Sequence, residues 1–306
     1  MSMKPLFIVC AALLTTLTLT AQPPASMKEP RKLAWTFKEK DRFQVETQVA
    51  LTQIRRTFNV PEFRDVVRVN TRSTFVVRKV DEDEGIQLEQ TIDSTQISFE
   101  GTNRLSAAGL ADTFTKMQGS TFRITLGSDW QVKKFDGYAE MLKRLNDTQT
   151  PEAVERFRQL VTEDDLKRAT EEGFGFLPES PVKVGETWTR PCKLHLAAAG
   201  VASTTLIYTL QSISSDGKAK IQVASKGSEF KGDLAGSAAK PDFAIESRTG
   251  SILFDTKTGR LVSSDINLRL KGTYLIQNPT GGLGLVPLEL IQQNIVKISL
   301  KDRTSK

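Results

Sequence analysis

The chain has 306 residues, of which 39% are hydrophobic and 25% are charged. This composition is typical of a globular protein and excludes an intrinsically disordered or collagen-like chain. The formal net charge of +6 is mild for this length and gives no signature of nucleic-acid binding.

The first 21 residues differ from the rest of the chain. Lys4 is the only charged residue before Lys28, and an apolar, threonine-rich stretch at 6–21 ends at a Gln-Pro-Pro break. A basic start, a short apolar stretch and a small residue before the cut are typical of a secretory signal peptide. We therefore expect cleavage of residues 1–21 and a periplasmic or extracellular mature protein with no transmembrane helix. The alternative is an uncleaved anchor, although a membrane span needs roughly 20 apolar residues.

Cysteine usage gives two further expectations. Cys10 lies near the start of the apolar stretch, too early to be a lipid attachment point. Cys192 is then the only cysteine of the mature chain and cannot form an internal disulfide. Stability must therefore come from an ordinary hydrophobic core.

Residues 22–33 are rich in proline and polar residues and predict a flexible leader. A first β region follows at 34–135. Phe43, Val45 and Val49 recur with a period of two, which is typical of a strand with one buried and one solvent-exposed face.

The sequence also predicts the later strands of this region. An acidic turn at 81–85 precedes a strand in which Leu88 and Ile92 share an apolar phase. The phase has shifted by Ile97 and Phe99, which predicts a β-bulge or a bend in this strand. Residues 101–120 predict a loop, and residues 121–135 predict a hairpin. The length of the strands favours a curved sheet.

The period changes to a helical one at 136–176. Asp136 is a predicted cap for the first helix, and Pro151 stands at the first position of the second. Thr162 and Asp165 have the spacing of a capping box, which predicts the start of a third helix.

The chain returns to β structure at 177–300, with a clear hairpin turn at 256–259 and a last strand near its end. Residues 301–306 predict a frayed tail. Each β region opens with a polar turn that leads to an aromatic residue, Phe43 or Trp188, which leaves a duplication open. The pattern predicts a β-rich α+β fold: two antiparallel, curved β-meander or partial-barrel regions bridged by a short helical segment.

Three stretches resemble exported bacterial proteins of unknown function. One is the Leu-Pro-x-x-Pro-Val-x-Val-Gly-x-x-Trp (LPxxPVxVGxxW) segment at 177–188. The others are the Trp-Thr-Phe-Lys stretch at 35–38 and the Gly-Ser-Asp-Trp hairpin at 127–130 with the helices after it. The resemblance implies an envelope or secreted protein with two β regions bridged by helices. It implies no catalytic or ligand-binding residue.

Cys192 and His195 are the only cysteine and histidine of the mature chain, and such a pair can supply a nucleophile and its base. Both lie in a predicted strand, where side chains three positions apart point to opposite faces. Cys192 then faces the core with Leu194 and Leu196, while His195 faces water with Lys193. A buried thiol has a raised pKa and is inert, so we interpret Cys192 as a core residue.

No other pattern predicts a catalytic, cofactor-binding or metal site. One cysteine and one histidine cannot supply the four ligands of a structural zinc ion. The acidic cluster at 81–84 lacks the spacing of a calcium loop, and the acids at 163–165 suit the positive end of a helix dipole. The glycine-rich run at 281–285 precedes a β-like segment, unlike a phosphate-binding loop.

A basic stretch of six arginines accompanies the early strands. We interpret it as the solvent-exposed face of a sheet; the alternative is contact with an anionic glycan, lipid headgroup or surface polymer. Its members are Arg55, Arg56, Arg64, Arg68, Arg72 and Arg78.

A curved, partly closed antiparallel sheet commonly holds a ligand cavity. We therefore expect a non-catalytic exported protein without a cofactor, which binds a lipophilic ligand or an envelope partner. That partner is a lipid, a glycan or an envelope protein, and not nucleic acid. The alternatives are a structural scaffold of the cell envelope and a hydrolase that uses carboxylates.

Overall fold

The computed structural model describes residues 29–81, 83–101, 111–195, 200–232, 242–277 and 284–302. The expected signal peptide at 1–21, Cys10, Leu196, the start of the glycine-rich run and most of the tail lie outside the described residues. The last strand continues through Asp302, so the first two residues of the expected tail belong to the sheet.

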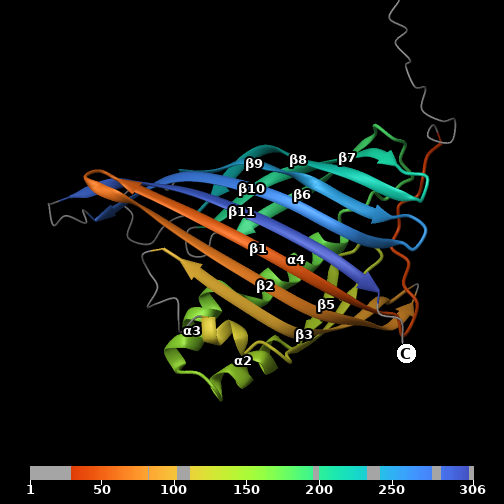
Figure 1. Cartoon of the computed structure of the whole chain (residues 1–306), viewed down its shortest axis with the longest axis horizontal. Helices are drawn as coiled ribbons and strands as arrows, with labels where there is room; N and C mark the ends of the chain where they lie inside the picture. Colours follow the sequence, from red (N-terminus) through yellow and green to blue (C-terminus); the bar gives the residue numbers. More distant parts are fainter. Residues whose placement is uncertain are drawn as a thin grey trace, which may run out of the picture.

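The described chain forms one antiparallel sheet of eleven strands, in the order β5-β4-β3-β2-β1-β11-β10-β9-β8-β7-β6 (Figure 1). The strands are β1 (Arg42–Thr57), β2 (Val60–Asp81), β3 (Gly85–Glu100), β4 (Thr121–Leu126), β5 (Val132–Asp136), β6 (Thr187–His195), β7 (Val201–Ile213), β8 (Lys218–Lys231), β9 (Asp242–Asp255), β10 (Arg260–Gln277) and β11 (Leu285–Asp302). The predicted β-rich, curved meander is confirmed.

The two β regions are parts of this one sheet. The first strand of the chain, β1, pairs with the last, β11, from Phe43 opposite Asp302 to Thr57 opposite Leu288. Each of these strands would otherwise expose an unpaired edge, so their pairing removes two edges at once. The remaining edges are the short β5 and β6, and β6 contains Pro191, a residue that sheets tolerate at an edge.

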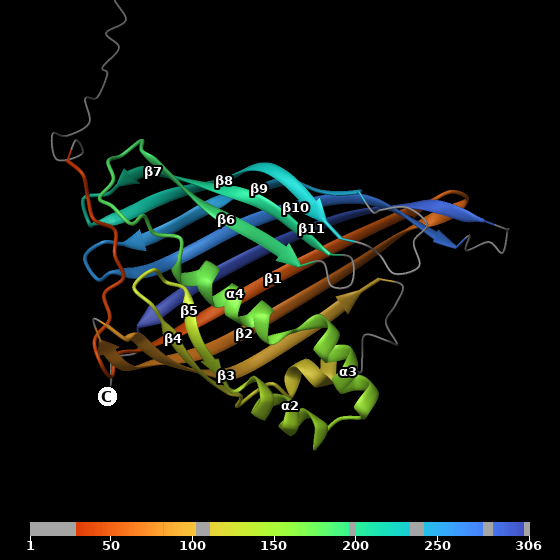
Figure 2. The same ribbon diagram turned by 180° about the vertical axis from the view of Figure 1, so that it is seen from behind.

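The named helices are α2 (Tyr138–Asn146), α3 (Pro151–Leu160) and α4 (Glu163–Phe174). Helix α4 lies across the concave face of the sheet, whereas α2 and α3 lie beside β3, beyond the outline of the sheet (Figure 2). The predicted start of α4 is confirmed, because Thr162 and Asp165 form a complete capping box. The predicted cap of α2 is wrong: Gly137 is its N-cap, while Asp136 ends β5 and pairs with Lys134. The expected loop at 101–120 contains a helical turn at 111–115.

The predicted bulge in β3 is confirmed at Asp93. Ile92 pairs with Ser73, whereas the pairing resumes two residues later, so Asp93 is the extra residue. Its carboxylate accepts hydrogen bonds from Gln44 and Thr74 on the polar face of the sheet. After the bulge, the apolar phase of β3 continues one position later than simple alternation predicts.

The segment before β1 is anchored rather than flexible at its end. Arg31 and Val182 exchange both backbone hydrogen bonds, of 2.8 and 3.0 Å, and Leu33 is buried. The side chain of Trp35 packs in the core, and its Nε1–H donates to the carbonyl oxygen of Phe174 at the end of α4 (2.8 Å). Burial of apolar side chains at every second position therefore overrides the polar composition of the leader.

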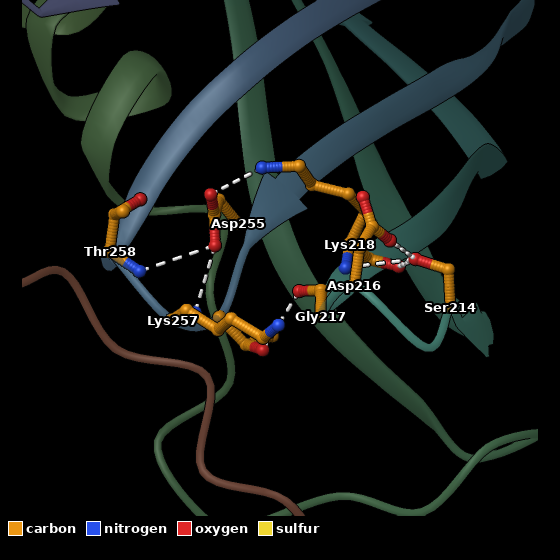
Figure 3. Close-up of polar contacts among 8 residues, drawn as sticks. Ser214, Asp216, Gly217, Lys218, Asp255, Lys257 and Thr258 are labelled. Carbon is orange, nitrogen blue, oxygen red and sulfur yellow. Dashed lines mark hydrogen bonds and ion pairs between the residues drawn. The ribbon is translucent and has the colours of Figure 1, made fainter.

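Polar contacts join the two turns at one end of the second β region (Figure 3). The carboxylate of Asp255 accepts hydrogen bonds from Lys218 and from the backbone N–H groups of Lys257 and Thr258. Burial raises the pKa of Asp255, but these donors outweigh it and lower the pKa to about 2.

We expect Asp255→Asn to lower the free energy of unfolding at pH 7 by about 1.5–3 kcal/mol, because the charged acceptor of three hydrogen bonds is lost. The folded-state pKa is depressed, so the stabilisation by the native carboxylate is present above about pH 4 and lost as the pH falls towards 2. The variant should therefore lose less stability than the native protein over this range. Urea unfolding at pH 7, 4 and 2.5 measures both effects, and Asp242→Asn is the matched control. If the free energy of unfolding changes with pH equally in the two variants, the prediction is wrong.

Candidate functional site

A cavity of about 290 Å³ lies between helix α4 and the concave face of the sheet. Strands β1, β2, β3 and β11 form its floor, and α4 forms its opposite wall. Aromatic and aliphatic side chains dominate the lining, and no lining residue carries a charge. The lining residues are Trp35, Phe43, Val45, Thr47, Thr71, Ser73, Phe75, Gln90, Ile92, Met117, Phe122, Phe135, Leu166, Ala169, Thr170, Gly173, Phe174, Leu261, Ile298 and Leu300.

Small residues of α4 create the space. Gly173 faces the cavity, and a Cβ atom built on it would meet no other atom within 4 Å. Ala169 lies one turn earlier on the same helix, lines the cavity and is exposed to solvent, so the cavity opens beside this residue. A larger side chain at either position would fill the gap between helix and sheet.

The few polar groups of the lining lie mostly on the sheet. Gln90 donates a hydrogen bond from Nε2 to the hydroxyl of Ser73 (3.2 Å), and Thr47 and Thr71 are cross-strand neighbours. The hydroxyl of Thr170 on α4 donates to the carbonyl oxygen of Leu166 (2.9 Å) and is thereby engaged within the helix. A mostly apolar cavity with a few polar groups is the usual form of a small-molecule site.

A second, polar pocket of about 300 Å³ lies on the other side of α4 and includes Cys192, Glu172 and Tyr208. Arg248 reaches this region from β9, where its guanidinium donates to Glu172 (2.7 Å) and to the Cys192 sulfur (2.7 Å). The arginine side chain is 14% exposed and the glutamate side chain 32% exposed. The group is a half-buried ion pair in contact with a thiol.

The pKa shifts in this pocket make the thiol unreactive. Burial, followed by the charge of Glu172, raises the pKa of Cys192 to about 11. Burial also raises the pKa of Tyr208 to about 12. Burial alone would lower the pKa of Arg248, but Glu172 outweighs it and raises that pKa. At neutral pH Cys192 is a protonated thiol, and the thiolate is the nucleophile, so this pocket does not activate the cysteine.

The predicted core position of Cys192 is confirmed, since the residue is 3% exposed. Leu194, on the same phase, is half-buried and packs against the core. His195 ends β6, but its side chain lies outside the described residues, so the predicted orientation of the histidine stays a prediction.

The other charged clusters have structural explanations. Asp81 accepts hydrogen bonds from the backbone N–H groups of Glu84 and Asp83 and pairs with Lys79, contacts that lower its pKa to about 2. In α4, Asp165 belongs to the capping box and Glu163 pairs with Lys167. Within the described ranges, no three His, Cys, Asp or Glu side chains converge as metal ligands.

The basic stretch is largely neutralised by neighbouring acids. Four of its six arginines form ion pairs between neighbouring strands. The stretch is not a single sheet face, because the adjacent residues Arg55 and Arg56 of β1 point to opposite faces. The pairs are Arg55–Asp65, Arg56–Glu62, Arg68–Glu100 and Arg78–Glu89.

Residue patterns did not reveal the cavity. The sequence feature that could have indicated it is the pair Ala169 and Gly173, two small residues one turn apart on a helix whose other side carries larger side chains. Such spacing places both on one face, but only the position of the sheet shows that this face meets a curved floor.

No helix in the described ranges combines the length and the apolar character that crossing a membrane requires.

Solved structures with some likeness have low sequence identity. Lipovitellin, from a study of its lipid–protein interactions, has 9% identity and a TM-score of 0.40. The match covers 89% of this chain and 26% of the lipovitellin chain, so this chain spans about a quarter of lipovitellin's length. An outer membrane channel from Pseudomonas putida F1 has 9% identity and a TM-score of 0.24, with 92% of this chain and 100% of that chain covered. DynF of the dynemicin biosynthesis pathway of Micromonospora chersina has 8% identity and a TM-score of 0.19, with 91% and 90% covered. These scores are too low to carry a functional argument.

A search of curated proteins gave no match. A family model matches residues 84–261, which is more than half of the chain and extends from the start of β3 to the start of β10. The matched part includes α4 and the polar pocket of Cys192. The chain belongs to DUF6263, a family of unknown function.

Proposed function

We propose that this protein is an exported, non-catalytic binder of a small lipophilic ligand, which it holds in the cavity beneath α4. The observation that carries the proposal is a cavity of about 290 Å³ with an apolar lining that contains no charged residue. Removing an apolar ligand from water into such a site is favourable by roughly 25 cal/mol per Å² of apolar surface buried.

The size of the cavity limits the ligand. At about 30 Å³ for each water-sized group, 290 Å³ holds about ten such groups, which corresponds to a medium-length hydrocarbon chain. The opening beside Ala169 offers an entry path without unfolding of the sheet.

The alternatives find less support in the same geometry. A hydrolase that uses carboxylates needs two acidic groups at the bound substrate, and this cavity has no acidic lining residue. A scaffold that binds through an apolar surface needs a large exposed patch. The exposed large hydrophobic residues of the described chain are only Phe58, Phe63, Val80 and Leu285, and they lie away from the cavity.

The test uses the neutral fluorescent probe N-phenyl-1-naphthylamine and the purified mature protein. We expect saturable binding, with energy transfer from Trp35, which lines the cavity. Gly173→Leu should weaken probe binding at least tenfold, because its side chain extends into space that the native helix leaves open. Native mass spectrometry of the same sample would detect a lipid that co-purifies.

Gly173→Ala is the matched control. Both variants should raise the free energy of unfolding by up to about 1 kcal/mol, because alanine and leucine have a higher helix propensity than glycine. Gly173→Ala should change probe affinity less than twofold. Equal probe binding by the native protein and both variants would refute the proposed site.

A further inference from the structure

Two hydroxyl groups, those of Thr47 and Thr71, lie side by side on the floor of the cavity, and Thr95 continues their row beyond the cavity lining. Thr47 on β1 pairs with Thr71 on β2, and Thr71 pairs with Thr95 on β3. Residues directly opposite each other on neighbouring strands lie on the same face of a sheet, so the three threonines share the concave face. Thr47 and Thr71 line the cavity, as does Ile92, which precedes Thr95 on the same face of β3.

Thr95 is the unusual member of this row. Its side chain is buried, at 4% exposure, and its Oγ1 has no hydrogen-bond partner among the described residues. Buried polar groups are nearly always paired, because an unpaired one loses its hydration without compensation. The bulge at Asp93 is what brings the Thr95 hydroxyl to the concave face, since simple alternation from Ile92 would place Ser94 there instead.

The polar part of the lining has hydrogen-bonding capacity without charge. The threonine row lies beside Ser73, which accepts a hydrogen bond from Gln90. Hydroxyl groups both donate and accept, so they can bind either a carbonyl or a hydroxyl oxygen. A carboxylate or phosphate in the same place would have no cation to offset its lost hydration.

Resting on the function proposed above, we infer that the ligand is an uncharged amphiphile. Its single hydroxyl or carbonyl oxygen hydrogen-bonds to the hydroxyl groups of Thr47 and Thr71, which line the cavity. Its hydrocarbon part lies against the aromatic residues of the cavity, which include Phe43 and Phe75. Medium-chain alcohols and esters belong to this class, and fatty acids in their ionised form do not.

The experiment measures displacement of N-phenyl-1-naphthylamine from the full-length mature protein at pH 8 by 1-decanol and by decanoate. The two competitors have the same chain length, and only decanoate is charged. We expect 1-decanol to displace the probe at a concentration at least tenfold lower. Equal potency, or greater potency of decanoate, would overturn the inference.

Two variants test the hydroxyl row. Thr47→Val and Thr71→Val keep the side-chain shape and remove one lining hydroxyl each; we expect each to weaken 1-decanol about five- to tenfold and to change probe and decanoate binding less than twofold. Thr95→Val should raise the melting temperature of the ligand-free protein, because it removes an unpaired buried hydroxyl, and should leave 1-decanol binding unchanged, because Thr95 does not line the cavity. Thr74→Val, the control, removes a hydroxyl that donates to Asp93 (2.7 Å) on the opposite face. This control should lower the melting temperature and leave 1-decanol binding unchanged.

The outcomes separate this inference from the proposed function. If the native protein binds no probe, the cavity is not a lipophile site and both proposals fail. If the probe binds but Thr47→Val and Thr71→Val leave 1-decanol unaffected, the site stands and the role of these hydroxyl groups is refuted.

Discussion

Trp35→Ala is expected to lower the free energy of unfolding by about 3–5 kcal/mol, the range for truncating a buried aromatic side chain. The Trp35 indole is 7% exposed and lies within 5.2–6.3 Å of five other aromatic rings, measured between ring centroids. Those rings come from the segment before β1, the β4–β5 turn, the end of α4 and β9: Phe37, Trp130, Phe174, Phe176 and Phe254. Removing the indole leaves a void where these segments meet.

Trp35→Phe separates packing from hydrogen bonding. It keeps an aromatic ring but loses the donor to the carbonyl oxygen of Phe174, so we expect a cost of only about 1–2 kcal/mol. Urea unfolding followed by far-UV circular dichroism measures both variants. A loss below about 1 kcal/mol for Trp35→Ala would show that the segment before β1 is not part of the cooperative core.

Glu172→Gln should lower the free energy of unfolding by about 3 kcal/mol. The change leaves the guanidinium of Arg248, 14% exposed, without its counter-ion in a pocket that also holds the neutral thiol of Cys192. Breaking a buried ion pair by removing one partner typically costs about 3–5 kcal/mol, and the partial exposure of Glu172 places this case at the lower end.

A double-mutant cycle tests whether the loss comes from the unpaired charge. Arg248→Met should cost less than Glu172→Gln, about 1–2 kcal/mol, because the remaining carboxylate can reach solvent. The double variant should then be more stable than Glu172→Gln alone. Glu229→Gln, which breaks the exposed pair with Lys231, is the surface control and should have no measurable effect. If Glu172→Gln also leaves the free energy of unfolding unchanged, solvent screens the Glu172–Arg248 pair and the prediction is wrong.

The bulge in β3 could be predicted from the sequence of its strand, but its consequence for the neighbouring strand could not. The shift of apolar phase between Ile92 and Ile97 predicted it, because alternation is a local property of one strand. That the bulge places Thr95 opposite Thr71, a residue of the cavity lining on the next strand, depends on register between strands. Register is set by pairing and packing across the sheet.

The candidate site shows the same division. Burial of Cys192 could be predicted from the alternation of β6, and the start of α4 from the capping box of Thr162 and Asp165. The contact of Cys192 with Arg248 could not, since the two residues lie 56 positions apart on different strands. The local sequence around either residue does not predict its contact with the other.

The sequence by itself determined the β-rich character, the helical segment in the middle and the positions of the main turns, because periodicity, capping and turn residues act over a few neighbouring positions. Only the tertiary structure decided that β1 and β11 join two β regions into one sheet, and that Gly173 of α4 faces a cavity on its concave side. The physical reason is distance along the chain: strand pairing and cavity shape arise from packing between segments far apart, which no local pattern encodes.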